Sequence, residues 1–339
     1  MAKVLVTGGA GYIGSHTCLE LLNAGHEVVV LDNLSNSSAE SLNRVQTLTS
    51  KTLDFIQGDI LDHDILDQTF AQHQIDAVIH FAGLKAVGES QQIPLKYFEN
   101  NIAGSISLVQ AMQRASVFCL VFSSSATVYD EANISPLNED MPTGIPSNNY
   151  GYTKLIVEQL LQKLSAADAR WSIALLRYFN PVGAHKSGQM GEDPRGIPNN
   201  LMPFVTQVAV GRREKLSIFG HDYPTEDGTC ERDFIHVVDL AKAHVLAIQN
   251  RLNQTGCRAW NIGTGKPISV LAIKNTFEQV NGIKIPFEFA PRRAGDLASF
   301  YADSQRASEE LNWTAAYTLE DMLADSWNWQ KNNPDGYLA

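Results

Sequence analysis

The sequence has few cysteines and comparatively few basic residues. Its four cysteines, Cys18, Cys119, Cys230 and Cys257, are far apart in the 339 residues and include no C-x-x-C pair. This spacing argues against a zinc site and against a disulfide framework, so we expect no metal site. Acidic residues outnumber basic ones by 37 to 26, for a net charge of −11. Because nucleic-acid binding needs a basic surface, the charge argues against that role and favours a small phosphate ligand in a local basic pocket.

Long apolar runs are also missing. No uninterrupted stretch approaches the roughly 20 apolar residues of a membrane-spanning helix, so we expect no membrane partner. The first residues, Met1-Ala2-Lys3, lead directly into an apolar segment without the small-residue cleavage site of a signal peptide. We therefore expect a cytoplasmic protein.

Short apolar segments alternate with segments of helical spacing through the first half of the chain. Several of these segments, such as 28–31, are continuously apolar, which is typical of parallel strands covered on both faces. The pattern predicts an α/β fold with a doubly wound parallel sheet of the Rossmann type. The six expected strands are residues 3–7, 27–32, 53–57, 77–81, 119–123 and 172–178.

After about residue 180 the chain becomes richer in Gly, Pro and Asn, and its expected strands and helices become shorter. This change predicts one domain over 1–180 and a smaller lobe over 181–339, with possible exchange of a strand or helix across the boundary. The last residues, 332–339, are expected to form a polar tail.

A glycine-rich turn follows the first expected strand. Gly9, Gly11 and Gly14 satisfy G-x-G-x-x-G, and Gly8 provides a second register of the motif. Glycine is required there because the turn is tight and because a pyrophosphate approaches the backbone at the start of the next helix, expected over 15–23. By itself the motif is also compatible with a plain turn. The order of strand, turn, helix and strand favours a dinucleotide site.

Acidic and apolar residues follow the next strands at the sheet edge where ligands of such folds bind. Asp32 ends the second strand, where a carboxylate accepts hydrogen bonds from the adenosine ribose and repels a 2′-phosphate, so NAD is favoured over NADP. The alternative is an acidic residue in a solvent-exposed loop. Asp59 and Ile60 follow the third strand, and the run Phe81-Ala82-Gly83-Leu84-Lys85 follows the fourth.

A candidate catalytic group combines a serine with a tyrosine and a lysine. Tyr150 and Lys154 are spaced i, i+4, which places both side chains on one face of a helix. A phenol has a pKa of about 10, and roughly 4 kcal/mol of preferential anion stabilisation is needed to bring it near neutrality. The Lys154 ammonium is one source. Ser125, in a serine-rich run after the fifth strand, is the best hydroxyl to bridge Tyr150 and a substrate. The alternative is an exposed helix face.

Together these motifs resemble the extended short-chain dehydrogenase/reductase family over nearly the whole chain. Three runs, 78–90, 175–184 and 223–229, are similar to those of its UDP-glucose 4-epimerases. The resemblance implies Ser125, Tyr150 and Lys154 as catalytic residues and UDP-glucose and UDP-galactose as substrates. The residues implied to hold NAD are Gly8, Gly11, Tyr12, Ile13, Gly14, Asp32, Asn33, Asp59, Ile60, Phe81, Ala82, Gly83, Lys85, Asn100, Tyr150, Lys154 and Phe179.

The resemblance also implies a set of residues for the UDP-sugar. Arg232 and Arg293 would face the diphosphate, where a guanidinium matches phosphate oxygens, although Arg293 could instead be a solvated loop charge. Phe300 would form the wall of the sugar pocket, or else support the core of the lobe. The implied set is Ser125, Tyr150, Asn180, Asn199, Asn200, Leu201, Arg232, Arg293, Asp296 and Phe300.

The implied reaction is inversion at carbon 4 of the sugar through a 4-keto intermediate, with a hydride passed to bound NAD and returned. A 4,6-dehydratase of the same family would need an acid and a base where this chain has Ala126 and Thr127. A non-enzymatic NAD-sensing protein would have no need of Ser125, Tyr150 and Lys154 together. Relatives also imply a homodimer formed through helices at 98–114 and 153–164.

Two departures from the family pattern are visible. Asp130 stands where the family usually has glycine, and Asn148-Asn149 precede Tyr150 where proline is often found. Both are expected to lie in loops.

Overall fold

The computed structural model describes residues 1–196, 198, 200–293 and 295–338, and the chain forms two compact units. The boundary expected near residue 180 would place the stretch Ala241–Trp260 in the smaller lobe, but this stretch belongs to the first unit, an exchange of the kind that the expectation allowed. The first unit contains Met1–Asp130, Pro142–Arg177 and Ala241–Trp260, and the second contains Glu131–Met141, Tyr178–Leu240 and Asn261–Ala339.

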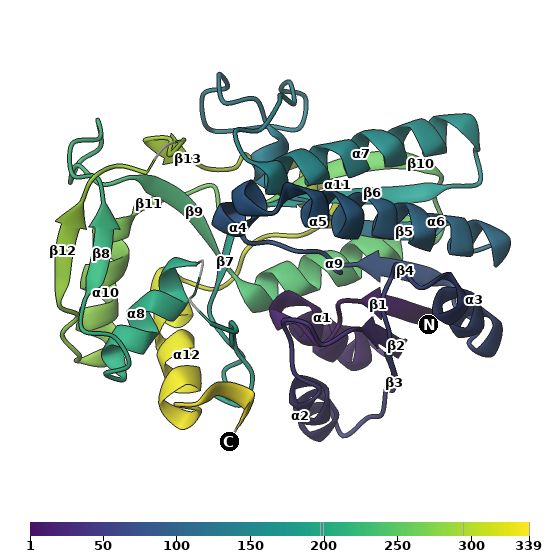
Figure 1. The fold of residues 1–339 in the computed structure, drawn as a ribbon, viewed down its shortest axis with the longest axis horizontal. Helices are drawn as coiled ribbons and strands as arrows, with labels where there is room; N and C mark the ends of the chain where they lie inside the picture. Colours follow the sequence, from purple (N-terminus) through teal and green to yellow (C-terminus); the bar gives the residue numbers. More distant parts are fainter. Residues whose placement is uncertain (197, 199, 294, 339) are drawn as a thin grey trace. The chain divides into compact units, whose positions relative to one another are not determined.

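The first unit is built on a seven-stranded sheet, in which all described pairings are parallel (Figure 1). The predicted fold class is confirmed, and the six predicted strands form with bounds that differ by at most one residue at either end. The seventh strand was not predicted, because it comes long after the others in the sequence. In spatial order the strands are β10 (Gly256–Ile262), β6 (Ser172–Tyr178), β5 (Cys119–Ser123), β4 (Ala77–His80), β1 (Lys3–Thr7), β2 (Glu27–Asp32) and β3 (Asp54–Gln57).

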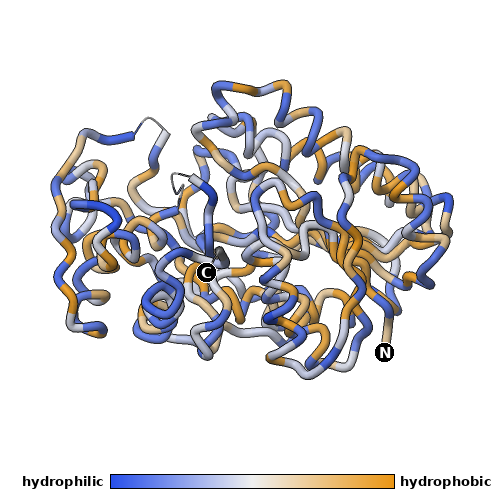
Figure 2. The backbone as a smooth tube through the Cα atoms, turned by 60° about the horizontal axis from the view of Figure 1, so that its bottom comes forward, coloured by the Kyte–Doolittle hydropathy of each residue, from blue (hydrophilic) through white to orange (hydrophobic). Residues whose placement is uncertain are grey.

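Helices cover both faces of this sheet, which explains why the middle residues of its central strands are apolar (Figures 1 and 2). Helices α3 (His63–Gln72), α6 (Gly104–Arg114) and α7 (Asn149–Ala167) lie on one face, and α1 (Tyr12–Asn23), α2 (Glu40–Thr49) and α9 (Val237–Arg251) lie on the other. The shorter helical segments are α4 (Val87–Gln92), α5 (Pro94–Tyr97), the π-helix η1 (Phe98–Ala103) and the 3₁₀ turn η2 (Ala126–Val128).

The second unit has smaller sheets and its own apolar core. One sheet contains β7 (Asn180–Val182), β9 (Glu231–His236), β11 (Pro267–Ser269) and β13 (Ser299–Phe300), and another pairs β8 (Leu216–Phe219) with β12 (Phe287–Ala290). Its helical segments are α8 (Leu201–Ala209), α10 (Val270–Asn281), α11 (Gln305–Leu311), α12 (Leu319–Asn332) and the 3₁₀ turn η3 (Gly336–Leu338).

The expectation of a polar tail over 332–339 was wrong for its described part. Asn333 and Tyr337 are buried, and η3 ends the described chain in a hydrogen-bonded turn. In the part of the chain that the structure describes, no helix combines the length and apolar character needed to cross a membrane.

Candidate active site

The glycine-rich turn after β1 is closed by contacts that only glycine permits. Gly8 has a φ of +72°, and a Cβ atom there would lie 2.7 Å from the backbone nitrogen of Ala82. A Cβ at Gly14 would collide with the carbonyl oxygen of Gly8. Helix α1 begins at Tyr12 and Ile13, directly after Gly11, which has no side chain to cap it. The turn therefore presents a helix N-terminus to an anion, as a pyrophosphate cradle does.

Asp32 is buried beside this turn. One carboxylate oxygen accepts a hydrogen bond from the Ala10 backbone N–H at 3.0 Å, and the other accepts bonds from Leu34 N–H and Ser37 Oγ, both at 2.8 Å. Only 8% of the residue is exposed. Asp32 is thus held at the end of β2 by the loop around it and is not a solvent-exposed charge.

The ends of β2 and β3 meet in a hydrogen bond. Asn33 Nδ2 donates to Asp59 Oδ2 at 2.8 Å, while Asp59 Oδ1 accepts from the Leu61 backbone N–H at 2.9 Å. Ile60 is buried, and a Cβ at Gly104 would lie 2.5 Å from its Cδ1, so α6 begins in close contact with it. Three of the residues expected to contact NAD are therefore neighbours at one edge of the sheet.

The end of β4 is tied to β1 and to the π-helix. The backbone N–H groups of Phe81 and Ala82 both donate to the Thr7 carbonyl, at 2.9 and 3.1 Å. Asn101, which follows Asn100 in η1, donates from Nδ2 to the Leu84 carbonyl at 3.0 Å and to Thr153 Oγ1 at 2.9 Å. Gly83 lies against Asn101, and Lys85 is exposed.

Lys154 is buried beneath the aromatic ring of Tyr150. Its Nζ donates to the Ser123 carbonyl at 2.7 Å and lies 5.9 Å from the centre of the Tyr150 ring. Burial lowers the pKa of Lys154 to about 8, an effect that the charge of Glu158 opposes. Burial and the nearby Lys154 lower the pKa of His80, at the end of β4, to about 3, so His80 is neutral. The ammonium of Lys154 is therefore available to stabilise an anion at Tyr150.

Ser125 lies on a segment that contacts the start of α7. Its Oγ accepts hydrogen bonds from the Thr127 backbone N–H at 3.2 Å and from Thr127 Oγ1 at 3.0 Å. A Cβ at Gly151 would lie 3.1 Å from Thr127 Oγ1, so Gly151, next to Tyr150, packs against Thr127 in the Ser125 segment. The small size of Gly151 brings these two catalytic candidates onto neighbouring segments.

A buried ion pair supports the same region. Arg177 on β6 and Glu158 on α7 form a bidentate pair, with 2.7 Å between Nη2 and Oε2 and 3.0 Å between Nε and Oε1. Both side chains are almost completely buried, and Ser124 Oγ donates to the same Glu158 carboxylate. Glu158 thereby links the helix carrying Lys154 to the strand end carrying Ser125.

In the second unit, Arg232, Arg293 and Asp296 form a charged cluster. Arg232 Nη2 lies 3.1 Å from Asp296 Oδ1, and its Nη1 donates to the Leu297 carbonyl at 2.8 Å. Arg293 is exposed, but its guanidinium lies 3.9 Å from the centre of the Phe219 ring. The Arg293 carbonyl accepts a hydrogen bond from the Asp296 backbone N–H at 3.3 Å, which joins Arg293 to this cluster. Burial raises the pKa of the Cys230 thiol, and the charges of Arg232 and Arg293 oppose that rise.

Two aromatic rings lie next to this cluster. Phe300 pairs with Arg232 in the register of β13 and β9, and its ring is 5.4 Å from that of Phe179. Asn180 is exposed at the start of β7. Asn200 is at the N-cap position of α8 without a side-chain capping bond, and Leu201 is the first residue of that helix. Asn199 lies outside the described residues. Among the residues that are described, no group of His, Cys, Asp and Glu is arranged to hold a metal ion.

Comparison with known proteins identifies the family. Residues 4–263 match the profile of the NAD dependent epimerase/dehydratase family. The chain belongs to this family. It is 60% identical over 336 residues to a UDP-glucose 4-epimerase of Bacillus subtilis, with 99% of each chain covered. It is similar to the crystal structure of UDP-glucose-4-epimerase from Stenotrophomonas maltophila with bound NAD and formylated UDP-arabinopyranose (TM-score 0.96, 50% identity, 98% and 99% of the two chains). It is also similar to the Bifidobacterium longum enzyme in complex with NAD+ and UDP (TM-score 0.96, 49% identity, 98% and 99%).

The NAD dependence of this family fits the residues of the first unit. Because the turn is made of glycines, the backbone at the start of α1 has no side chains that would block a pyrophosphate. The Asp32 carboxylate at the end of β2 is where a ribose hydroxyl would donate a hydrogen bond.

The two departures from the family pattern have local explanations. Asp130 lies against Gly144, where any Cβ would collide with the Asp130 carboxylate. The space that Asp130 needs is therefore provided by a glycine on the neighbouring segment. Asn148 caps α7 by accepting a bond from the Gly151 N–H at 2.8 Å, and Asn149 donates to the Ser90 carbonyl at 2.9 Å. Asn149 is the first residue of α7, so the expectation that it lies in a loop was wrong. The cap positions the helix turn that carries Tyr150.

Several residues around the candidate site were not predicted from the sequence. Asn101, Gly151, the Glu158–Arg177 pair and Phe219 each contact a predicted residue or its neighbour. The only sequence signal for Asn101 was a second asparagine beside Asn100. The ion pair gave no signal, because its members are 19 residues apart.

Proposed function

We propose that this protein interconverts UDP-galactose and UDP-glucose by inverting carbon 4 of the sugar. The observation that carries the proposal is the buried Lys154 ammonium next to Tyr150, on a helix that packs against the Ser125 segment. This arrangement supplies a proton-transfer group beside a dinucleotide cradle. Sequence identity of 60% to a UDP-glucose 4-epimerase over 99% of both chains supports the same assignment.

In the proposed mechanism Tyr150, as a phenolate, takes the proton of the sugar 4-hydroxyl, and the sugar becomes a 4-ketone. NAD held at the glycine turn and Asp32 would supply the reversible hydride acceptor that oxidation and reduction of carbon 4 need. Lys154 holds the phenolate by its charge, and Ser125 hydrogen-bonds the reacting oxygen. Tyr150 then returns the proton, so the residues end the cycle as they began it.

The second unit is assigned to the UDP part of the substrate. Arg232 and Arg293 bind the diphosphate, because a guanidinium fork matches phosphate oxygens. Asn180, Asn200, Leu201 and Asp296 are assigned to the nucleoside or sugar. The stacking of Arg293 on Phe219 supports this assignment, since it holds the guanidinium in one plane.

The test is to supply UDP-galactose to the purified protein with no added NAD and to measure UDP-glucose. We expect turnover, and we expect NAD in the supernatant after denaturation, because the cycle regenerates the cofactor. A dehydratase would form a 4-keto-6-deoxy product instead, but Ala126 and Thr127 lack the required acid and base. No product at all would favour a binding protein.

Asp32 is expected to exclude NADP. The wild-type protein, stripped of cofactor, should bind NAD at least about tenfold more tightly than NADP, because the carboxylate repels the extra phosphate. Asp32→Asn should narrow this ratio, as judged by titration of the stripped protein with each cofactor. Asp64→Asn, which removes an exposed charge on α3, is the control. Equal wild-type affinities would contradict the placement.

Phe300 is expected to restrict the sugar range. An N-acetyl group at carbon 2 would have to displace the packed ring, at a cost of roughly 1–3 kcal/mol, or about tenfold to hundredfold in rate. Wild type should therefore strongly prefer UDP-galactose to UDP-N-acetylgalactosamine, and Phe300→Ala should reduce that preference. Initial rates on both substrates measure it, with Phe289→Ala, an exposed phenylalanine of β12, as control. An unchanged ratio in Phe300→Ala would disprove the assignment.

Two further expectations stay predictions. These are a cytoplasmic location and a homodimer formed through η1, α6 and α7, the helices that cover residues 98–114 and 153–164.

A further inference from the structure

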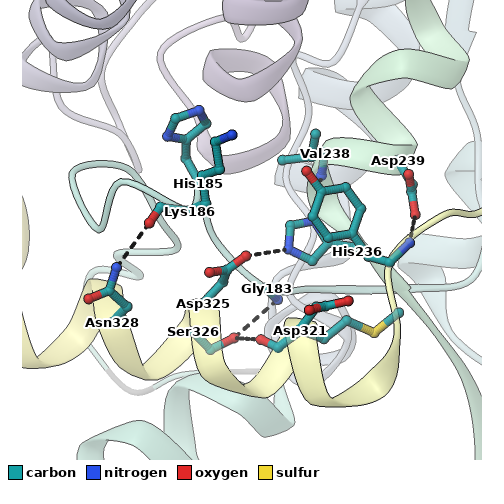
Figure 3. A network of polar contacts seen from close by, with 12 residues as sticks. Gly183, His185, Lys186, His236, Val238, Asp239, Asp321, Asp325, Ser326 and Asn328 are labelled. Carbon is teal, nitrogen blue, oxygen red and sulfur yellow. Dashed lines mark hydrogen bonds and ion pairs between the residues drawn. The ribbon is translucent and has the colours of Figure 1, made fainter.

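Helix α12 forms hydrogen bonds to the first part of the chain segment between β7 and α8. Ser326 Oγ accepts a hydrogen bond from the Gly183 N–H at 3.1 Å, and Asn328 Nδ2 donates to the Lys186 carbonyl at 3.1 Å (Figure 3). Farther along, Asn333 Nδ2 donates to the Gly188 carbonyl at 2.9 Å. Helix α12 and the residue after it therefore hold this segment at Gly183, Lys186 and Gly188.

The C-terminal turn η3 completes this attachment. Tyr337 is buried, and its hydroxyl accepts from the Gly191 N–H at 3.2 Å. Its backbone N–H donates to the Asp193 carboxylate at 2.9 Å, and its ring lies 4.7 Å from that of Trp329. Trp329 Nε1 in turn donates to the Glu192 carbonyl at 3.2 Å.

Two glycines make the packing of this turn possible. A Cβ at Gly191 would collide with the Trp329 ring, and a Cβ at Gly336 would collide with the Asp193 carboxylate. Residues 191–193 are therefore held between Trp329 and η3 without space for an added carbon.

Glu192 connects this turn to the substrate residues. Its carboxylate accepts a hydrogen bond from Asn200 Nδ2 at 2.8 Å, and Asn200 directly precedes α8. Glu192 is thus hydrogen-bonded by its backbone to Trp329 and by its side chain to Asn200.

We propose that η3 and Trp329 form a C-terminal clasp that positions Asn200 for the UDP-sugar, with Tyr337 and Glu192 as positioning residues. The inference rests on the assignment of Asn200 to the substrate under the proposed function. It adds a role for the C-terminal residues in substrate affinity, because Trp329, Tyr337 and Glu192 are not among the residues assigned to proton transfer or to NAD.

The test compares two glycine variants with similar backbone strain. Gly336 and Gly282 have φ values of +72° and +68°, but a Cβ at Gly282 meets nothing within 4 Å. Gly336→Ala should raise the dissociation constant for UDP and the KM for UDP-galactose about tenfold, with kcat and bound NAD unchanged. Gly282→Ala should change none of these values. Urea unfolding of both variants shows whether they are equally stable.

Three further variants identify the route and remain informative if Gly336→Ala does not fold. Tyr337→Phe, which removes only the hydroxyl, and Glu192→Ala should raise the same constants, and Glu192→Gln should restore them because it keeps an acceptor oxygen. Wild-type constants in Tyr337→Phe and Glu192→Ala would overturn the clasp. Asn200→Ala is measured beside them, and unchanged UDP binding in that variant would overturn the assignment of Asn200 and this inference with it. The epimerase function is tested separately, by the turnover of the unmodified protein on UDP-galactose.

Discussion

Replacing Tyr150 by phenylalanine is expected to lower kcat for UDP-galactose by about 10²–10⁴-fold while NAD stays bound. The variant lacks only the phenolic oxygen that takes and returns the proton of the 4-hydroxyl. Its ring, which lies over the Lys154 ammonium, is retained. Initial rates with saturating UDP-galactose measure the loss, and the absorbance of NAD released on denaturation shows that the cofactor site is intact.

Tyr152→Phe is the matched control for this experiment. Tyr152 is on the same helix two residues later, and its ring packs edge-on against Phe98 rather than near Lys154. Its loss of a hydroxyl should leave turnover within about twofold of wild type. Turnover near the wild-type level in Tyr150→Phe would mean that another group transfers the proton.

Replacing Arg177 by methionine is expected to lower the free energy of unfolding by about 3–5 kcal/mol. The substitution leaves the Glu158 carboxylate buried without its bidentate partner, and a buried charge that has lost its partner is far more costly than the pair was favourable. The midpoint and slope of urea unfolding give the loss.

Arg114→Met provides the comparison, because Arg114 forms an equally short ion pair with Asp67, at 2.7 Å, with both side chains about half exposed. That variant should lose only about 0–1 kcal/mol. A second comparison combines Arg177→Met with Glu158→Leu, which removes both charges and should recover much of the stability. Equal losses in Arg177→Met and Arg114→Met would show that the buried pair is not a special contributor.

The parallel sheet was predictable because local pattern carries it. Segment 28–31 is apolar at every position, and a strand of that kind is stable only between two layers of helices. The glycine turn was predictable for a different reason, since the close approach of Gly14 to Gly8 leaves no choice of residue. Strand β10 escaped prediction because its place beside β6 depends on a contact between distant parts of the chain.

For the candidate site, the sequence predicted the principal side chains but not the residues that hold them in place. The spacing of Tyr150 and Lys154 places them on one helix face by geometry alone. It does not reveal that Lys154 is buried with its Nζ on the Ser123 carbonyl, which lowers its pKa to about 8. Nor does it reveal that Asn101 bonds Thr153, 52 residues away.

By itself, then, the sequence determined the alternation of strands and helices, the glycine turn and the placement of Tyr150 and Lys154 on one helix, because each depends on neighbours within a few residues. Only the tertiary structure decided which distant groups support them. Tyr337 lies 146 residues from the Gly191 that it bonds, and Arg232 lies 64 residues from Asp296. Such partners are chosen by packing, because a buried polar group needs a partner wherever the folded chain brings one, and hydrophobic periodicity does not encode that choice.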